Sequence, residues 1–324
     1  MAVPAGTFQT FQSVGNREDL EDVIWDISPM ETPFQSMISK GKAKATYHEW
    51  QTDALDAAAA NVQVQGDDAA TNTASPTVRL RNYCQILSKT ARVSGTQDAV
   101  DKAGRDSEMA YQVMKRMKEL KRDLEFALVR NQESTSGTAT VGAKSAGVES
   151  WIATNITSVG LGSGFSTPGY SNGTVSAPFD ATARGSLTEA SLKSVIAATW
   201  AAGGDPTTLM VGPLTKQKIS TAFNGVATRY RDVPAGKQAQ VISGVDLYVS
   251  DFGEHKIVPN RFMRDQIVLV LDPEYWQLAQ LRPLKSWELA KTGDSERRQM
   301  LMEVCLVARN EKANGKVADI DPTK

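Results

Sequence analysis

The spacing of apolar residues changes along the chain, and the clearest pattern is the three- to four-residue spacing of a helix. Between Thr96 and Gln132 apolar residues recur every three or four positions, so one face of a long helix should be buried along its whole length. Thr96 is placed to cap this helix, with Asp98 in its first turn. The opposite face mixes lysine and arginine with glutamate, which favours a solvated face or a subunit contact over a membrane- or DNA-binding helix.

An alternating pattern predicts two strands upstream of this helix. Residues Ala45 to Leu55 are rich in aromatic and β-favouring side chains, and the segment Pro76 to Ser94 begins by alternating apolar residues with arginine. The tract between them, Asp56 to Ser75, has too few apolar residues to form a core and should be mobile in an isolated subunit. Because a two-stranded ribbon is marginally stable alone, we expect a neighbouring subunit to support it.

The second half of the chain alternates between the two periods, which indicates a small α/β domain. The predicted helices are Thr188–Ala202 and Pro213–Phe223, and the predicted strands are Thr207–Gly212 and Val245–Ser250. Long strands follow at Gln266–Leu271, Tyr275–Leu281, Ser286–Ala290 and Met300–Asn310. Every second residue from Met300 to Ala308 is apolar, and the apolar face of the long helix is the natural place for this strand face to pack.

Composition narrows the classes of protein that fit. The chain has 324 residues and a formal net charge of -1, so it lacks the basic footprint of a protein that recognises DNA directly. It has no export signal and no run of about eighteen apolar residues, so we expect a soluble protein with no membrane contact. Cys84 and Cys305 are too few and too far apart in sequence for a disulfide framework, which favours synthesis in a reducing cytoplasm.

Residues that could carry chemistry are sparse. The sequence has no phosphate-binding glycine loop, no H-E-x-x-H and no C-x-x-C. His48 beside Glu49, or the carboxylates Asp251, Glu254 and Asp272, could serve a hydrolase of unknown substrate. Ordinary roles in a strand or a turn are favoured for all five. We therefore expect no catalytic residue, no cofactor and no metal site.

Several phrases, in their order along the chain, give the sequence a resemblance to a known family. They are VGNREDLEDVIWDISPMETPFQSMISKGKA at 14–43, YHEWQTDAL at 47–55, GVESWIATN at 147–155, GPLTKQKIS at 212–220, VSDFG and VPNRF within 249–262, and LAKTGDSERRQMLMEVCLVARNEKA at 289–313. Each phrase is weak alone, and the order carries the specificity. The chain resembles the major capsid proteins of tailed bacteriophages with the Hong Kong-97-type fold, an α+β architecture.

The resemblance implies a division of the chain into five parts. Residues 1–44 would be an N-terminal arm, 45–95 an extended ribbon called the E-loop, and 96–185 the peripheral domain with its long spine helix and a connector. Residues 186–253 would be an α/β axial domain. Residues 254–324 would supply the return strands of both domains and the C-terminus.

The resemblance also implies a function and partners. Such a protein would assemble with itself, as pentamers and hexamers, into an icosahedral head around packaged double-stranded DNA, in the virion after assembly in the host cytoplasm. A separate scaffolding protein, a portal protein and non-specific contact with DNA are expected, with decoration proteins as further candidates. The arm starts at Met1 without a long helical segment before it, which favours the separate scaffolding protein. An encapsulin-like compartment shell is the alternative within the fold.

Candidate contacts between subunits follow from the ribbon and from the predicted loop Asn224 to Gln240. Rotation about a five- or six-fold axis would bring copies of this loop together, so its like charges would repel. Either Asp232 bridges to an arginine of the next copy, which we favour, or the loop stays splayed and solvated. The candidate residues are Trp50, Arg79, Arg81, Arg229, Arg231, Asp232 and Lys237.

Overall fold

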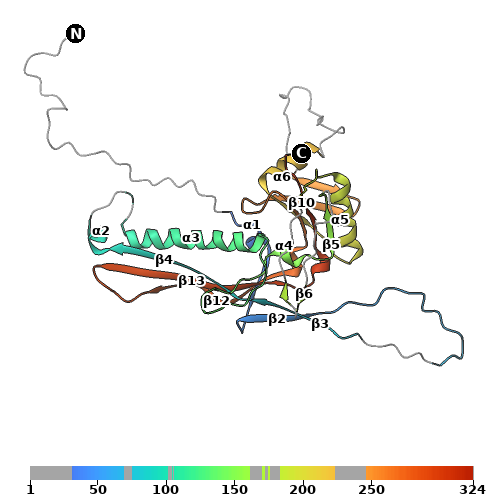
Figure 1. The fold of residues 1–324 in the computed structure, drawn as a ribbon, viewed down its shortest axis with the longest axis horizontal. Coiled ribbons are helices and arrows are strands. Elements are labelled where there is room, and N and C mark those ends of the chain that lie inside the picture. Colours follow the sequence, from blue (N-terminus) through green and yellow to red (C-terminus); the bar gives the residue numbers. More distant parts are fainter. Residues whose placement is uncertain are drawn as a thin grey trace, which may run out of the picture.

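The computed structural model describes residues 31–68, 75–100, 104, 106–160, 170–171, 174–175, 183–222 and 246–323. Within these residues the chain forms an elongated body, in which one long helix lies on a four-stranded sheet, and a compact α/β unit at one end of it (Figure 1). None of the helices in the described part of the chain is long and apolar enough to cross a membrane.

The sheet of the elongated body joins strands from both ends of the chain. Its strands, in spatial order, are β1 (Ser39–Lys42), β12 (Trp276–Glu288), β13 (Ser295–Ala308) and β4 (Gln85–Ser94). β1 is parallel to β12, whereas β13 is antiparallel to both of its neighbours. The long strands pair over ten residues or more, so this sheet is a rigid platform rather than a marginal ribbon.

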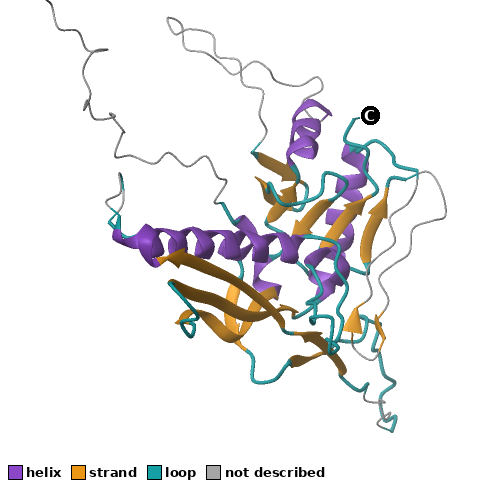
Figure 2. Ribbon diagram, turned by 60° about the vertical axis from the view of Figure 1, so that its left-hand side comes forward, coloured by secondary structure: helices purple, strands orange, loops and turns teal. Residues whose placement is uncertain are grey.

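The long helix α3 (Glu108–Val129) lies along one face of this sheet (Figure 2). Its buried leucines share a core with alternate residues of β13, as the sequence predicted; the members are Leu120, Leu124, Leu128, Met302, Val304, Leu306 and Ala308. A smaller cluster joins Met109 of the helix to Met300, Ala91 and Val93 at the far end. The helix is therefore held along its length by the hydrophobic effect.

The other face of the sheet is partly covered by a two-stranded ribbon of β2 (Tyr47–Thr52) and β3 (Val78–Tyr83). Cys84, directly after β3, packs with Ala279 and Cys305 of the sheet, and Trp50 of β2 borders this cluster. The base of the ribbon thus belongs to the fold of its own subunit.

The compact unit is built on a six-stranded mixed sheet with its own core. Its strands, in spatial order, are β5 (Asn155–Ser158), β14 (Gly315–Ala318), β11 (Val268–Leu271), β8 (Thr208–Val211), β10 (Gly253–Pro259) and β9 (Leu247–Ser250). Its helices are α5 (Glu189–Ala201) and α6 (Pro213–Ala222), both close to their predicted ranges. The shorter elements are α1 (Pro33–Met37), α2 (Gly95–Ala99), α4 (Val148–Trp151), η2 (Pro273–Tyr275), η3 (Glu311–Ala313), β6 (Tyr170–Ser171) and β7 (Thr174–Val175).

The predicted start of the long helix at Thr96 is wrong. Ser94 caps the short helix α2 through Gln97 N, and α3 begins at Glu108 after its own cap, Ser107, which accepts a hydrogen bond from Ala110 N. β4 is paired with β13 as far as Ser94, and the helix predicted from Thr96 is interrupted after α2, where Val100 adopts an extended conformation. The turn between the two helices includes Gly104 at φ 75°, a conformation that favours glycine.

Two predicted strands also divide differently. The return segment Pro76 to Ser94 splits into β3 and β4 at Cys84, whose backbone N–H donates to Thr46 O at 2.7 Å instead of joining a ladder. Conversely, the two strands predicted from Tyr275 to Ala290 form the single strand β12, with shifts of register on either side of Arg282. Pro283 lies within that irregular stretch, because a proline cannot donate to a ladder.

Candidate assembly surfaces

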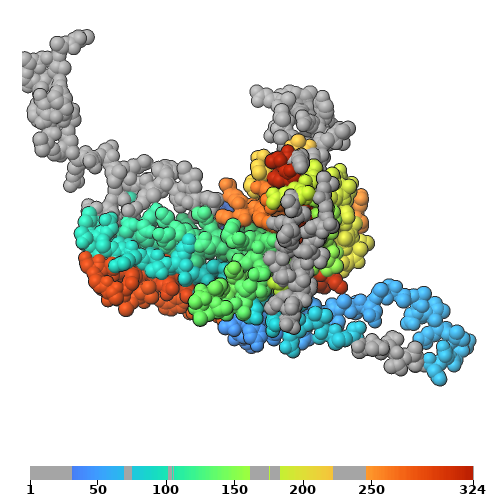
Figure 3. All heavy atoms as spheres, in the orientation of Figure 1, coloured from blue at the N-terminus to red at the C-terminus, as the bar shows by residue number. Residues whose placement is uncertain are grey.

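The ribbon extends beyond the body as an unsupported arm (Figures 1 and 3). Its paired part ends where Thr52 faces Val78, and residues 53–68 that follow form no helix or strand. Apolar side chains on this stretch face solvent: Leu55 is 99% exposed and Val62 90%. Exposed apolar side chains on an extended segment are typical of a surface that another chain covers.

The three predicted contact residues of the ribbon take different positions. Trp50 is half-buried and lies over Trp151, with 5.2 Å between ring centroids, so its ring is part of its own subunit's core. Arg79 is exposed and forms a long ion pair of 3.7 Å with Glu49. Arg81 stands opposite Glu49 in the ladder and is half-buried. Arg79 is therefore the member of this group most accessible to a neighbour.

The four predicted contact residues of the axial loop, Arg229, Arg231, Asp232 and Lys237, lie outside the described residues. The elements on either side of the loop are α6 and β9, and β9 is the edge strand of its sheet. Leu247 and Val249 of β9 are 52% and 65% exposed. An edge strand with exposed apolar side chains is a natural pairing surface.

A second exposed apolar patch lies on the long sheet, on the face that carries the ribbon. Ile86 pairs with Glu303, and Leu301 pairs with Lys285, while Trp287 pairs with Gln299; directly paired residues point to the same face. These positions share the face of Cys305, which the ribbon covers further along. Ile86 is 53% exposed and Trp287 42%, and Leu301 is half-buried. We call Ile86, Trp287 and Leu301 the sheet patch.

The sheet patch is not visible in the sequence. Ile86 of β4 lies about two hundred residues before Trp287 of β12 and Leu301 of β13, and the register that brings the three together arises only on folding. The one available signal was the presence of large apolar residues at positions that alternate with the buried ones.

A groove of about 550 Å³ lies where the arm leaves the body. Its walls are the ribbon ends, around Thr52 to Asp56 and Ser75 to Leu80, and Asn310 to Lys312 of the body. The groove shows that the arm does not pack tightly against its own subunit at this point.

Residues that could have served a hydrolase do not converge. His48 lies on β2 beside Trp50, and burial lowers its pKa. Asp251 and Glu254 flank the turn between β9 and β10, whereas Asp272 follows β11, and β8 lies between β10 and β11. Asp272 instead accepts a hydrogen bond from Glu274 N at 3.2 Å, and burial raises its pKa. In the described parts of the chain, no group of three or more histidine, cysteine or acidic residues could hold a metal ion.

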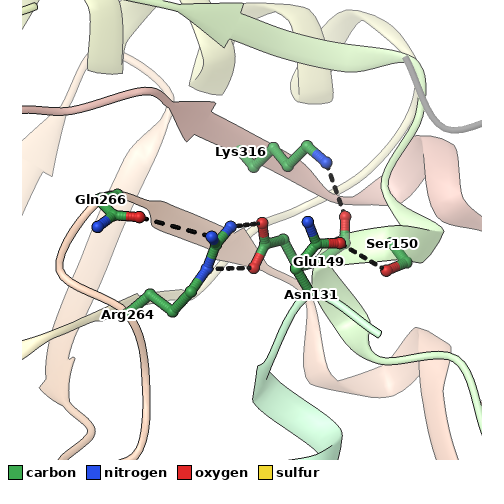
Figure 4. Close-up of polar contacts among 6 residues, drawn as sticks. All are labelled: Asn131, Glu149, Ser150, Arg264, Gln266 and Lys316. Carbon is green, nitrogen blue, oxygen red and sulfur yellow. Dashed lines mark hydrogen bonds and ion pairs between the residues drawn. The ribbon is translucent and has the colours of Figure 1, made fainter. Parts of the chain in front are cut away.

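Buried polar groups join the two bodies, and sequence reasoning missed them. Arg264, in the segment between β10 and β11, forms a two-pronged ion pair with Glu149 of α4, and Lys316 of β14 donates to the Glu149 backbone carbonyl at 2.7 Å (Figure 4). Asn131 and Ser150 bond to each other alongside. Glu149 is 2% exposed and Lys316 1%. This network joins the compact unit to the elongated body beside the end of the long helix.

Comparison with known proteins gives one consistent answer. Residues 3–321 match the family model described as SU10 major capsid protein. The major capsid protein of Escherichia phage Phieco32 is 30% identical over 336 residues, covering 95% of each chain.

Solved structures show the same fold at much lower identity. The capsid asymmetric unit of cyanophage A-1(L) has a TM-score of 0.68 at 11% identity, with 96% of this chain and 98% of that chain covered. The structure of Gordonia phage Cozz has a TM-score of 0.58 at 12% identity, with 97% and 96% covered. The holo-SrpI encapsulin complex of Synechococcus elongatus PCC 7942 has a TM-score of 0.56 at 9% identity, with 96% and 94% covered.

Proposed function

The chain belongs to the SU10 major capsid protein family and is a phage major capsid protein of the Hong Kong-97-type fold, and from this premise we propose how its surfaces build the shell. Subunits assemble as pentamers and hexamers into an icosahedral head around packaged double-stranded DNA, with a separate scaffolding protein and a portal during assembly in the host cytoplasm. The likeness to an encapsulin, at 9% identity, is a likeness of fold alone.

We assign the five parts of the chain as the resemblance implies. Residues 1–44 are the N-terminal arm, 45–95 the E-loop, 96–185 the peripheral domain's helix and connector, 186–253 the axial domain, and 254–324 the return strands and C-terminus. The elongated body fits the peripheral domain and the compact α/β unit fits the axial domain, although strands β10, β11 and β14 of the last part complete the axial sheet.

The observation that carries the assembly proposal is that the projecting ribbon arm and the sheet patch both expose apolar side chains. Residues 53–68, the described part of the projecting ribbon arm, carry exposed apolar side chains and form no helix or strand, while the sheet patch is an exposed apolar surface on a rigid platform. The ribbon already lies on this face of the sheet in its own subunit. We therefore propose that the arm of one subunit covers the sheet patch of the next, a head-to-tail contact that closes into a ring.

The test removes the projecting end of the ribbon and keeps its two paired strands. Because Thr52 pairs with Val78, residues 54–76 can be replaced by Asn-Gly, which favours the tight turn of a two-residue hairpin. The shortened subunit should fold and melt as the full chain does, and electron microscopy should show no closed shells. Closed shells of normal size would overturn the docking proposal.

The receiving surface has its own test. Ile86→Glu places a charge in the sheet patch at an exposed site, so it should block assembly with little effect on subunit stability. Val141, an exposed apolar residue in a loop, provides the matched control, and Val141→Glu should assemble normally. Normal assembly of Ile86→Glu would show that the sheet patch is not the receptor.

We propose a separate contact between neighbouring copies of the axial loop, Asn224 to Gln240. Substitution Asp232→Ala removes the acid that would bridge Arg229 or Arg231 of the adjacent copy, and should weaken capsomer closure more at low than at high salt, where screening relieves repulsion. Assembly indifferent to salt would contradict this contact.

A further inference from the structure

The acidic residues of α3 are all engaged within the subunit. Glu119 pairs with Arg116 at 2.7 Å and with Lys89 at 3.4 Å, and Asp123 pairs with Lys89 at 2.9 Å. Glu125 is fully buried and accepts backbone N–H groups from α1, and Glu108 is buried and accepts from Gln112. The hydrogen bond to Asp123 also raises the pKa of Lys89. The acidic side chains of this helix are therefore engaged by groups of the same subunit.

Four cationic side chains of the same helix, by contrast, form no ion pair with the described residues. Lys115, Lys118 and Lys121 are exposed, and no acidic partner for them is found among the described residues. Arg122 lies over the Phe262 ring, 5.8 Å from its centroid, and likewise has no ion pair with the described part of the chain. We call these four residues the α3 stripe. The first and last are seven residues apart, or roughly 10 Å along the helix axis.

The α3 stripe lies away from the sheet. On a helix, residues 115, 118 and 122 follow the spacing of three and four that defines one face, and the buried leucines occupy the opposite face. Lys121 lies beside this face, next to α1, where its carbonyl accepts from Gln35. In Figure 3 the side chains of α3 form a continuous surface along the elongated body, on the side opposite the ribbon.

The mixed charge of α3 in the sequence thus separates on folding. Lys89 comes from β4, some thirty residues earlier in the chain, and it forms ion pairs with both Glu119 and Asp123. From the sequence we favoured a solvated face or a subunit contact for this surface over binding to DNA; the pairing of both acids with Lys89 is what the sequence did not show. A nearly neutral protein consequently carries a local cationic surface.

We propose that the α3 stripe faces the shell interior and contacts the phosphate backbone of packaged duplex DNA. The inference rests on the proposed function, in which the shell encloses DNA. Lysine and arginine on a straight helix can neutralise phosphates without reading bases, which suits a container that must accept any sequence. Four cations per subunit give a weak contact individually, and repetition around the shell makes it strong collectively.

Two features favour DNA over an acidic protein segment. A protein partner would use apolar anchors as well as charge, and such anchors are few among the described residues of α3: Met114 is 60% exposed, and Phe126 is 45% exposed with the Arg130 guanidinium 4.8 Å from its ring centroid. The opposite face of the body carries the sheet patch, so the two faces differ in the kind of partner that each suits.

The test compares two variants that each lose three positive charges. The first replaces Lys115, Lys118 and Lys121 by Gln and leaves Arg122 on its ring. The control replaces Arg92, Lys285 and Lys291 by Gln; the first two are exposed on the ribbon face and the third in the β12–β13 connection. Binding of a labelled duplex to each purified protein is measured by fluorescence anisotropy from about 50 to 200 mM salt.

The unaltered protein should bind the duplex with an affinity that falls with salt. The α3 variant should lose about 0.9 of the log–log salt slope per lost phosphate contact, or about 2.7 in all, and the control should keep its slope. Equal losses in both variants, no loss in either, or no binding by the unaltered protein would overturn the inference. A third outcome would assign the stripe to a protein partner instead. In that case the α3 variant keeps a normal salt slope for DNA binding but fails in an assembly reaction that requires a co-expressed protein.

Electron microscopy separates this inference from the proposed function. If the unaltered chain forms no closed shells under assembly conditions, the proposed function fails whatever the DNA slope. If shells form but the assembled structure places α3 on the outside, the DNA inference alone fails.

Discussion

Glu125 should be one of the most sensitive positions in the unassembled subunit. Its carboxylate is fully buried in α3 and accepts three hydrogen bonds, from Phe34 N at 2.8 Å, Gln35 N at 3.0 Å and Asn260 Nδ2 at 2.7 Å. These donors come from α1 and from the segment after β10, so one side chain joins three parts of the fold. Glu125→Ala leaves all three donors without that acceptor.

The expected cost can be worked from these contacts. A buried donor left without a partner costs about 1 to 3 kcal/mol. Taking the low end for each of three donors, because water can enter the space left by the side chain, gives a loss of about 3 kcal/mol. For a chain of this length that corresponds to a fall of about 6 °C in the melting temperature, at about 2 °C per kcal/mol.

The pH dependence gives an independent check. Burial raises the pKa of Glu125 above its ordinary value, although hydrogen bonds from Phe34, Gln35 and Asn260 oppose this shift. A carboxyl whose pKa is higher in the folded state binds its proton more tightly there. Its contribution to stability is therefore complete below the unfolded pKa and is lost as pH rises through the folded pKa. The stability of the unaltered protein relative to Glu125→Gln, which does not titrate, should fall from pH 4 towards pH 7.

Denaturant unfolding and thermal melting of the unassembled subunit measure both effects. Glu119→Ala is the matched control, since it removes a partly exposed glutamate from the same helix and should cost at most about 1 kcal/mol. Amide hydrogen exchange should accelerate at Phe34 and Gln35 in Glu125→Ala alone. The reasoning is refuted if the two alanine variants melt within about 1 °C of each other, or if the difference from Glu125→Gln is constant with pH.

Two further predictions concern buried groups. Arg264→Leu removes the guanidinium that pairs with the buried Glu149 carboxylate, so it should destabilise the subunit by about 3 to 5 kcal/mol in urea unfolding. The double substitution with Glu149→Leu should recover much of the loss, and a single variant no less stable than the double would contradict this. Contact with the Cys84 thiol, together with burial, raises the pKa of Cys305. Iodoacetamide at pH 8 should therefore leave Cys305 unmodified in the native subunit and alkylate it after unfolding, as mass spectrometry can show, and rapid native alkylation would disprove the assignment.

The sequence by itself determined the elements whose signals are local. Helix α5 begins at Glu189 because Thr188 caps it and Leu192, Val195 and Ile196 repeat on one face, and both features are visible in the sequence. The strand β13 is equally clear, since alternate residues from Met300 to Ala308 are apolar and all of them are buried. The family phrases likewise lie in the sequence, and they predicted the capsid fold that the comparisons confirmed.

Only the tertiary structure decided where α3 begins. The ladder of β4 with β13 runs to Ser94, which caps the short helix α2 that contains Thr96; the chain is extended at Val100, and Ser107 caps α3. Local propensity is worth a few tenths of a kcal/mol per residue, whereas a ten-residue ladder over a buried core is worth several times more. The same reason explains the split at Cys84 and the continuity of β12.

The candidate surfaces depended on folding for a related reason. Lys89 reaches Glu119 and Asp123 across some thirty residues of sequence, and the partners of Glu125 lie 90 residues before it and 135 residues after it. A sequence shows which charges a helix carries but not which of them a distant strand will neutralise. The cationic face of α3 and the sheet patch therefore became visible only when long-range pairing had fixed the neighbours of each side chain.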